Sequence, residues 1–393
     1  MTTPRTATVP RTAQRGLATA TLALILAGCA GEPAATRPTS VPPSTGAATS
    51  TPAPTTPAPT TAAPSETATP QTPGEPGEPR VLATGLDVPW DLAVLPDGGA
   101  LVTLRQRAEV VLITPGAEPS VAARIDEARP DGEGGLLGLT LSPDFATDQA
   151  VYLYYTGSRD NRVVRYHYAD GRLNSPEPIL TGIPKSKNHN GGRIRFGPDG
   201  MLYITTGDNH AKPAHNAQNT RTLDGKILRV TPTGKVPGDN PFGNEVWSYG
   251  HRNVQGIGWD GQGRMYASEF GSGEFDELNL IEKGGNYGWP EAEGRSDNPD
   301  FIEPLLVWAT DDASPSGIAV TPDGTVFLAS LRGERLWRAQ WDGDRMVDDV
   351  YFDGAGRLRA VEIVGDELWL LTNNTARGKP GRDDDQLIAI KAP

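Results

Sequence analysis

From Arg80 onward the chain repeats one pattern of hydrophobic and polar positions. Apolar and polar residues alternate over a short run, a turn rich in Pro, Asp and Gly follows, and a second alternating run comes after it. A period of two is the spacing of a β-strand with one buried face, and the turn residues are those of a tight hairpin. The copies are residues 87–103, 138–155, 192–205, 256–267, 317–328 and, more weakly, 360–370.

About six strand-turn-strand copies at spacings of roughly 45–60 residues are typical of a β-propeller. We therefore predict an all-β fold, a six-bladed β-propeller of four-stranded antiparallel blades. One blade cannot bury both of its faces alone, so neighbouring blades stack around a central channel. A large β-sandwich is the alternative. In a propeller, residues at the same phase of each repeat meet at one mouth of the channel.

The first residues of the chain have a different pattern. Three arginines precede the apolar run 17–27, which is too short for a permanent membrane span and ends in Leu26-Ala27-Gly28-Cys29. This arrangement resembles a bacterial lipoprotein signal peptide, so we predict a signal over residues 1–29 and acylation of Cys29. A plain secretory signal is the alternative. The lipid would hold the protein on the bacterial cell membrane, outside the cytoplasm, and would be its only membrane contact.

Composition separates the remainder into two parts. Residues 30–79 are almost entirely Pro, Thr, Ala, Ser, Gly and Glu, which predicts a disordered spacer. Residues 80–393 contain no cysteine, so this predicted domain must be held together by core burial. The formal net charge of −13 argues against a nucleic-acid partner and makes a local cluster of arginines informative.

Several polar residues share the phase just before or at the first strand of a repeat. A histidine there is suited to general-base chemistry, and converging arginines suit a polyanionic ligand. The alternatives are a structural histidine and arginines in salt bridges between blades. A loop of glycines and carboxylates over residues 269–277 also suits a hard metal ion. The residues at this phase are Glu133, His189, Arg252, Asn253, Arg357 and Arg359.

Eight short motifs indicate a resemblance to a known protein family. They are residues 131–138, 188–194, 207–209, 223–229, 248–253, 268–271, 276–280 and 284–290. Over nearly all of residues 81–390 they make the chain similar to the soluble, PQQ-dependent sugar dehydrogenases of the glucose/sorbosone dehydrogenase family. The resemblance implies a six-bladed propeller that oxidises an aldose by hydride transfer from a sugar C–OH to PQQ. Calcium would assist, and an unidentified acceptor would take the electrons.

The resemblance also assigns roles to residues. The general base falls on His189 and the transition-state arginine on Arg252. Cofactor-binding positions fall on Glu133, Asn209, Asn253, Arg332, Arg357 and Arg359. The main-chain carbonyls of Gly271 and Ser272 would hold the calcium that ligates the quinone. A structural calcium site would be formed by Asp276, Glu277, Tyr287 and Asp297. The sugar site would include Trp308.

Three positions depart from the family pattern. Arg332 replaces a lysine and keeps its charge. Asn188 replaces an aspartate, which predicts that His189 loses a nearby carboxylate. Glu133 replaces a glutamine, which predicts weaker binding of a tricarboxylate cofactor. Two other functions stay open: a calcium-dependent lactonase-type hydrolase, and a catalytically idle propeller that binds a glycan or a cell-wall partner.

Overall fold

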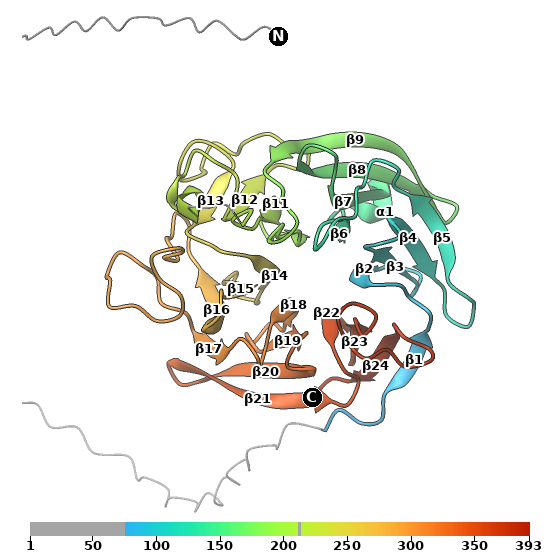
Figure 1. Ribbon diagram of the computed structural model, residues 1–393. Coiled ribbons are helices and arrows are strands. Elements are labelled where there is room, and N and C mark those ends of the chain that lie inside the picture. The colour runs from blue at the N-terminus through green and yellow to red at the C-terminus, as the bar shows by residue number, and fades with distance from the viewer. Residues whose placement is uncertain (1–74, 211–213) are drawn as a thin grey trace, which may run out of the picture. The chain divides into compact units, whose positions relative to one another are not determined.

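The computed structural model describes residues 75–210 and 214–393. In this part of the chain, six four-stranded antiparallel sheets are arranged as blades around a central axis (Figure 1). The predicted six-bladed propeller is confirmed, and the sandwich alternative is wrong. The predicted signal peptide with Cys29, and residues 30–74 of the predicted spacer, lie outside the described residues.

Five blades each consist of four consecutive strands, paired in chain order. The first holds β2 (Pro89–Val94), β3 (Ala100–Leu104), β4 (Glu109–Ile113) and β5 (Ser120–Arg124). The second holds β6 (Leu136–Leu141), β7 (Ala150–Thr156), β8 (Asn161–Ala169) and β9 (Arg172–Ile183). The third holds β10 (Ile194–Phe196), β11 (Leu202–Thr205), β12 (Lys226–Val230) and β13 (Val246–Tyr249).

The fourth blade holds β14 (Val254–Trp259), β15 (Met265–Glu269), β16 (Phe275–Ile281) and β17 (Leu306–Ala309). The fifth holds β18 (Pro315–Val320), β19 (Val326–Ser330), β20 (Arg335–Asp342) and β21 (Arg345–Asp353). The described helices are short: α1 (Phe145–Asp148) and a 3-10 turn at Ala214–Gln218. Within the described residues, no helix has the length and hydrophobicity needed to cross a bilayer.

The sixth blade joins the two ends of the folded region. It takes β22 (Leu358–Val364), β23 (Glu367–Thr372) and β24 (Leu387–Lys391) from the C-terminal end, and its outer strand is β1 (Arg80–Ala83). Val81 on β1 is paired with Ile388 on β24. The ring of blades is therefore closed by backbone hydrogen bonds between residues more than three hundred positions apart.

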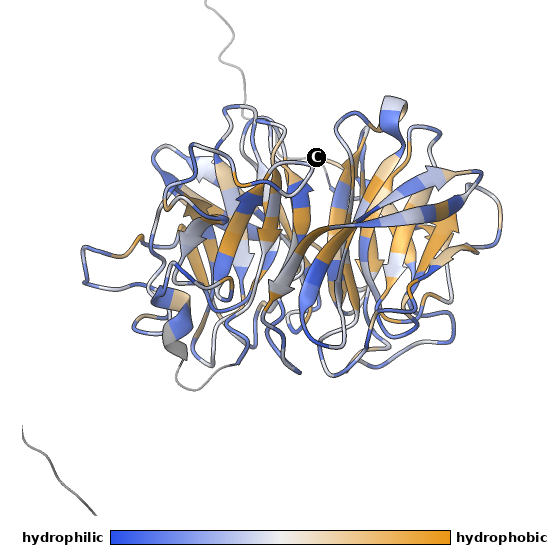
Figure 2. Ribbon diagram, turned by 90° about the horizontal axis from the view of Figure 1, so that it is seen from above, coloured by the Kyte–Doolittle hydropathy of each residue, from blue (hydrophilic) through white to orange (hydrophobic). Residues whose placement is uncertain are grey.

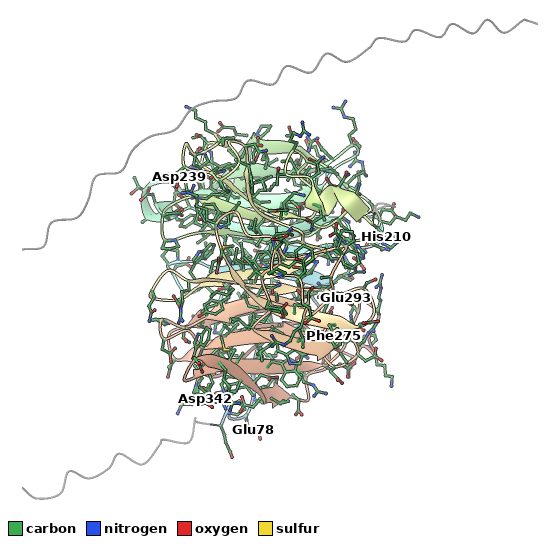
Figure 3. The ribbon with its side chains drawn as sticks, turned by 90° about the vertical axis from the view of Figure 1, so that its left-hand side faces the viewer. Glu78, His210, Asp239, Phe275, Glu293 and Asp342 are labelled. Atoms are coloured by element: carbon green, nitrogen blue, oxygen red, sulfur yellow. The ribbon has the colours of Figure 1, made fainter. Side chains whose placement is uncertain are left out.

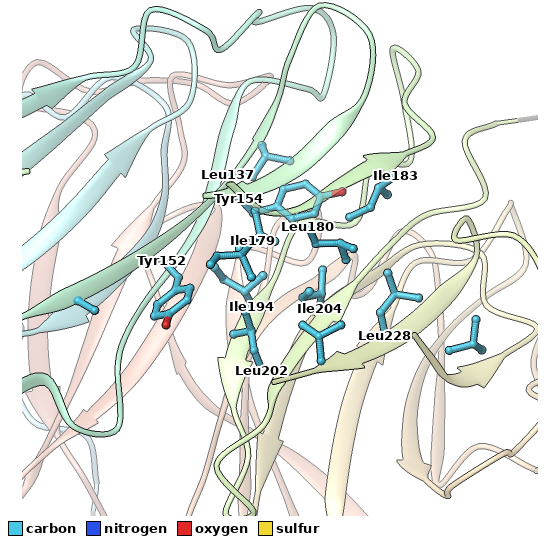
Figure 4. Close-up of a cluster of buried hydrophobic side chains, with 14 of the residues drawn as sticks. Leu137, Tyr152, Tyr154, Ile179, Leu180, Ile183, Ile194, Leu202, Ile204 and Leu228 are labelled. Carbon is cyan, nitrogen blue, oxygen red and sulfur yellow. The ribbon is translucent and has the colours of Figure 1, made fainter. Parts of the chain in front are cut away.

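Buried apolar side chains fill the spaces between adjacent blades. Figure 2 shows that the strands carry most of the hydrophobic positions and the loops most of the hydrophilic ones. One cluster joins the second and third blades (Figure 4), and each large aliphatic side chain buried there stabilises the fold by about 1.5–3 kcal/mol. Its members include Leu137, Tyr154, Ile194, Ile204 and Leu228.

The repeat copies coincide with the first two strands of the blades. First strands of neighbouring blades are packed against each other, and glycine permits the closest approaches. A Cβ added at Gly138 would lie 2.1 Å from the carbonyl oxygen of Gly192. Because antiparallel strands alternate in direction, each first strand begins at the end of the channel where each second strand ends. Loops before first strands and after second strands therefore meet.

Candidate active site

A cavity of about 460 Å³ lies where these loops meet, and all six blades contribute to its lining. Its volume is within the range of small-molecule sites. Six residues were predicted from their position in the repeat, and five of them line this cavity. Residues of the loops that follow second strands line it as well. The five predicted residues are Glu133, His189, Arg252, Arg357 and Arg359.

The lining of this cavity is strongly basic. Among the described residues that line it are six arginines and two carboxylates, so its formal charge is +4 in a chain of charge −13. The Nε atoms of three of these arginines are buried and have no hydrogen-bond partner among the described residues. Such unpaired donors cost free energy unless a ligand accepts their hydrogen bonds. The three are Arg105, Arg357 and Arg359.

Arg359 is the most deeply buried of these cations. Its Nη1 donates to the side-chain oxygens of Gln255 and Ser316, at 3.0 and 3.2 Å. Burial, followed by the positive charges of neighbouring arginines, holds the pKa of Arg359 well below its usual value. Its guanidinium carbon also lies 5.8 Å from the ring centre of Trp90, which lines the cavity. Buried cations placed this close together suit an anion with several carboxylates.

His189 has a defined environment at the cavity wall. Its Nδ1 lies 2.6 Å from Oδ1 of Asp208, and its Nε2 lies 2.9 Å from Nη2 of Arg252. A guanidinium group can only donate, so Nε2 must accept its hydrogen and Nδ1 must carry the ring proton. The neutral ring therefore keeps a lone pair on Nε2, which is the form required of a general base.

Asp208 corrects one expectation from the sequence. The replacement of an aspartate by Asn188 predicted that His189 would lose a nearby carboxylate, but Asp208 supplies one from the loop after β11. Its carboxylate also accepts the backbone N–H of His210 at 2.8 Å and the indole N–H of Trp289 at 2.9 Å. Burial raises the pKa of Asp208, yet these donors and His189 outweigh burial and leave it below its usual value.

Arg252 is held by both its backbone and its side chain. Its backbone N–H donates to the buried carboxylate of Glu269, and its Nη1 donates to the carbonyl of Phe270 at 3.0 Å. Its guanidinium carbon lies 5.5 Å from the ring centre of Trp289. Glu269 in turn contacts the ring of His251, with 2.8 Å between Oε2 and Nδ1. The protein's own groups thus fix the guanidinium beside His189.

Glu133 is already paired. Its Oε2 accepts the backbone N–H of His189 at 3.2 Å, and its Oε1 lies 3.5 Å from Nη1 of Arg377. The two residues come from the second and sixth blades and meet beside the cavity. Arg377 therefore offsets part of the negative charge that Glu133 adds to the lining.

A second, much smaller cavity of about 10 Å³ adjoins the first. Glu269, Glu277, Tyr287 and Glu293 contribute to its lining, and its volume is near that of one water-sized sphere. Burial, followed by the negative charge of Glu269, raises the pKa of Glu277 to about 8. In residues 75–210 and 214–393, no cluster of three or more His, Cys, Asp or Glu side chains is arranged to hold a metal. Calcium here would need main-chain oxygens beside the carboxylates, a donor set that this ion accepts.

The loop of Gly271 and Ser272 is shaped by two acidic side chains. One oxygen of Glu293 accepts four successive backbone N–H groups, from Ser272 to Phe275, at 2.7–3.0 Å. Glu293 and Phe275 appear close together in Figure 3. Asp276 accepts the N–H groups of Gly271 and Ser314, and burial raises its pKa to about 6. These bonds fix the backbone where Gly271 and Ser272 line the main cavity.

The other predicted residues have various positions. Arg332 lines the cavity and is paired with exposed Asp311 at 2.6 Å. Asn253 is fully buried and accepts the N–H of Gly191, so the structure places it in the support of the His189 loop. Neither Asn209 nor exposed Asp297 is among the described residues that line either cavity.

Trp308 is not brought to the cavity. It lies on β17, the outermost strand of its blade, where it is buried in a hydrophobic cluster and donates its indole N–H to Asp348 at 2.8 Å. The position predicted for the sugar is therefore part of the core, because this face of the edge strand is covered by the next blade.

Sequence reasoning also missed residues that the structure places at the site. Asp208 belongs to the quoted motif 207–209, but only its neighbour Asn209 was singled out. Trp289 belongs to the quoted motif 284–290. Arg105 and Arg377 follow second strands, and that phase could have identified them by the same argument that identified the loops before first strands.

Comparison with known proteins agrees with this geometry. The model of the family "Glucose / Sorbosone dehydrogenase" matches residues 86–380. An aldose sugar dehydrogenase of Escherichia coli is 31% identical over 343 residues, which cover 75% of this chain and 90% of that protein. The PQQ-bound structure of an aldose sugar dehydrogenase from Streptomyces coelicolor is 45% identical with a TM-score of 0.78, covering 82% of this chain and 100% of that one. A putative glucose dehydrogenase from Thermus thermophilus is 38% identical with a TM-score of 0.75, covering 80% and 99%.

Proposed function

The chain belongs to the glucose/sorbosone dehydrogenase family, and we propose that it oxidises an aldose with PQQ as its cofactor. One observation carries this proposal: His189, oriented by Asp208 and Arg252, faces a cavity lined by six arginines, three of which have a buried Nε with no hydrogen-bond partner among the described residues. A base beside an anion site is what such a reaction needs from the protein.

The cavity's own chemistry fits PQQ. The carboxylates of PQQ would be held by Arg357, Arg359 and Arg332, which all line the main cavity. When bound there, PQQ would supply the quinone that accepts two electrons in the oxidation of the sugar. Trp90 and Gln255 complete the lining beside Arg359.

The residues of the chain perform the acid-base part of the reaction. Nε2 of His189 would take the proton of the sugar hydroxyl when that hydroxyl replaces Nη2–H of Arg252 as its hydrogen-bond donor, while Nδ1 keeps its own proton. Asp208 stabilises the imidazolium that forms, as a carboxylate does for the histidine of a hydrolase triad. Arg252, held in place by Phe270 and Glu269, provides positive charge where negative charge develops.

Calcium belongs to the same proposal. The carbonyls of Gly271 and Ser272 would hold one ion at the main cavity, and Glu277 with the Tyr287 carbonyl would hold another in the small one. A bound ion supplies positive charge that stabilises developing negative charge and offsets the repulsion between Glu277 and Glu269. The resemblance assigns Asp276 to the same ion as Glu277, but Asp276 lines the main cavity and accepts the N–H of Gly271 at 2.9 Å, so we assign it to the first position instead. Exposed Asp297 remains an expectation from the resemblance.

The setting of the enzyme is also proposed. Acylation at Cys29 would anchor it outside the cytoplasm on the bacterial membrane, with residues 30–79 as a spacer. The sugar enters from solvent, and a separate acceptor removes the electrons.

A titration tests the proposal. The protein is mixed with PQQ in calcium, the absorbance of the quinone is followed, and a panel of aldoses with a dye acceptor is then added. We expect saturable binding, bleaching of the quinone by an aldose and reduction of the dye. Absence of binding at micromolar PQQ would overturn the cofactor assignment and favour the glycan-binding alternative. Hydrolysis of a lactone in calcium without PQQ would favour the lactonase.

A further inference from the structure

Trp289 connects the two sides of the site. Its indole N–H donates to Oδ2 of Asp208 at 2.9 Å, and its ring faces the guanidinium of Arg252 at 5.5 Å. Oδ1 of the same carboxylate receives Nδ1–H of His189. One indole therefore contacts both partners of the base through different parts of its surface.

Trp289 is itself held firmly. Its backbone N–H donates to the carbonyl of Gly250 at 2.9 Å, and its own carbonyl accepts Nε2 of Gln218 at 2.8 Å. Gly250 lies two residues before Arg252. The loop after β16 is thus tied to the turn that carries the arginine, so the indole has a fixed position relative to it.

We propose that Trp289 is a positioning residue that keeps His189 in the tautomer protonated on Nδ1. The structure shows one donor to Oδ2 of Asp208 and two donors to Oδ1. Without the donor to Oδ2, the carboxylate can rotate about its terminal torsion, which is a soft coordinate. Rotation would weaken one of the two hydrogen bonds that favour this tautomer and leave only the donor from Arg252 to Nε2. Part of the His189 population would then carry its proton on Nε2, where the ring cannot act as the base.

The alternative is that Trp289 only fills space beside Arg252. Its two contacts can be separated, because phenylalanine keeps an aromatic face for the guanidinium but has no N–H. Trp337→Phe is the matched control: this indole N–H is buried without a hydrogen-bond partner among the described residues, and Trp337 lines neither cavity of the site. That change removes the same atoms without removing a hydrogen bond.

The first measurement uses histidine labelled with 15N in the protein without cofactor, so it does not depend on the proposed reaction. The resonances of His189 are assigned with His189→Gln. We expect the wild type and Trp337→Phe to show one tautomer, protonated on Nδ1, and Trp289→Phe to show a mixture. Identical His189 nitrogen shifts in all three proteins would overturn the proposal.

The second measurement rests on the proposed function. With PQQ and an aldose, Trp289→Phe should lower kcat about tenfold, the effect of losing one hydrogen bond to a charged group, and leave KM unchanged. Loss of kcat with an unchanged tautomer would also overturn the inference. If the wild type shows no turnover, the proposed function fails and the nitrogen shifts still decide the role of Trp289.

A third measurement covers the case in which Trp289→Phe does not fold. In the otherwise wild-type chain, His189→Gln should shift the indole N–H resonance of Trp289 through their shared carboxylate and leave that of Trp337 in place. An unmoved Trp289 resonance would show that the two residues are not coupled.

Discussion

Replacement of Glu133 by glutamine tests whether the charge of the main cavity governs ligand binding. The change preserves the size of the side chain and removes one of the two lining carboxylates, raising the formal charge of the lining from +4 to +5. The amide oxygen can still accept the N–H of His189, which now lies 3.2 Å from Oε2. The pairing with Arg377 becomes a weak dipolar contact.

The size of the effect follows from the charges. Two unit charges 6–8 Å apart, at an effective dielectric constant of about 20–40, interact by roughly 1–3 kcal/mol. The repulsion in question is between the carboxylate of Glu133 and those of bound PQQ. Arg377 offsets some of it, but the Arg377 side chain is 72% exposed, and exposed ion pairs contribute only about 0–1 kcal/mol. We therefore expect Glu133→Gln to tighten PQQ binding by about 1.4 kcal/mol, which is roughly tenfold in Kd.

The assay is a fluorescence titration with PQQ, in which quenching of the tryptophan emission reports occupancy, since Trp90 is at the cavity wall. Arg377→Ala should weaken binding, and the two changes should not be additive because the residues form a pair. Glu118→Gln, at an exposed turn, controls for net charge. Unchanged or weaker binding by Glu133→Gln would refute the reasoning, since the carboxylate would then contribute to recognition.

Three further predictions concern the base, the metal and a buried amine. His189→Gln should lower kcat by about 10²–10⁴ with PQQ affinity retained, and an equal loss of affinity would contradict a role in proton transfer. Calcium should raise the melting temperature of the wild type relative to chelator by more than it raises that of Glu277→Gln, which keeps only the proposed position at Gly271 and Ser272; equal shifts in both proteins would show that Glu277 holds no ion. Lys226 is fully buried, and burial lowers its pKa from 10.5 to about 8. The unfolded chain therefore binds more protons between these pH values, and urea melts should show stability rising there by up to about 3 kcal/mol. Lys226→Met should lack this slope, and a wild-type curve without it would refute the assignment.

The fold was predictable because its signals are local and repeated. Alternating apolar residues around a turn predict a hairpin wherever they occur, and six copies leave few ways to cover both faces of each sheet. The convergence of Arg252, Arg357 and Arg359 followed from the same register, because equal phase in a propeller means the same end of the channel. No knowledge of loop paths was needed for that conclusion.

The contacts around His189 could not be predicted without knowing the paths of the loops. Asp208 reaches the imidazole because the chain turns after β11. The resemblance instead assigned a role to Asn209, the next residue in the same motif. Trp308 illustrates the opposite case. Its alternation on β17 is equally compatible with a pocket or a core, and only the neighbouring blade, through Asp348, decides between them.

The cluster of arginines that lines the main cavity carries an electrostatic cost. Arg359 is buried among cations that lower its pKa, and three guanidinium Nε atoms at the site have no acceptor among the described residues. Such an arrangement weakens the fold and persists only where something repays it. A ligand with several carboxylates removes the repulsion and fills the unpaired donors at once. Its binding free energy then adds to the stability of the fold. The same reasoning implies that the arginines nearest the centre are needed more for the ligand than for the propeller, whose blades are held by their apolar faces.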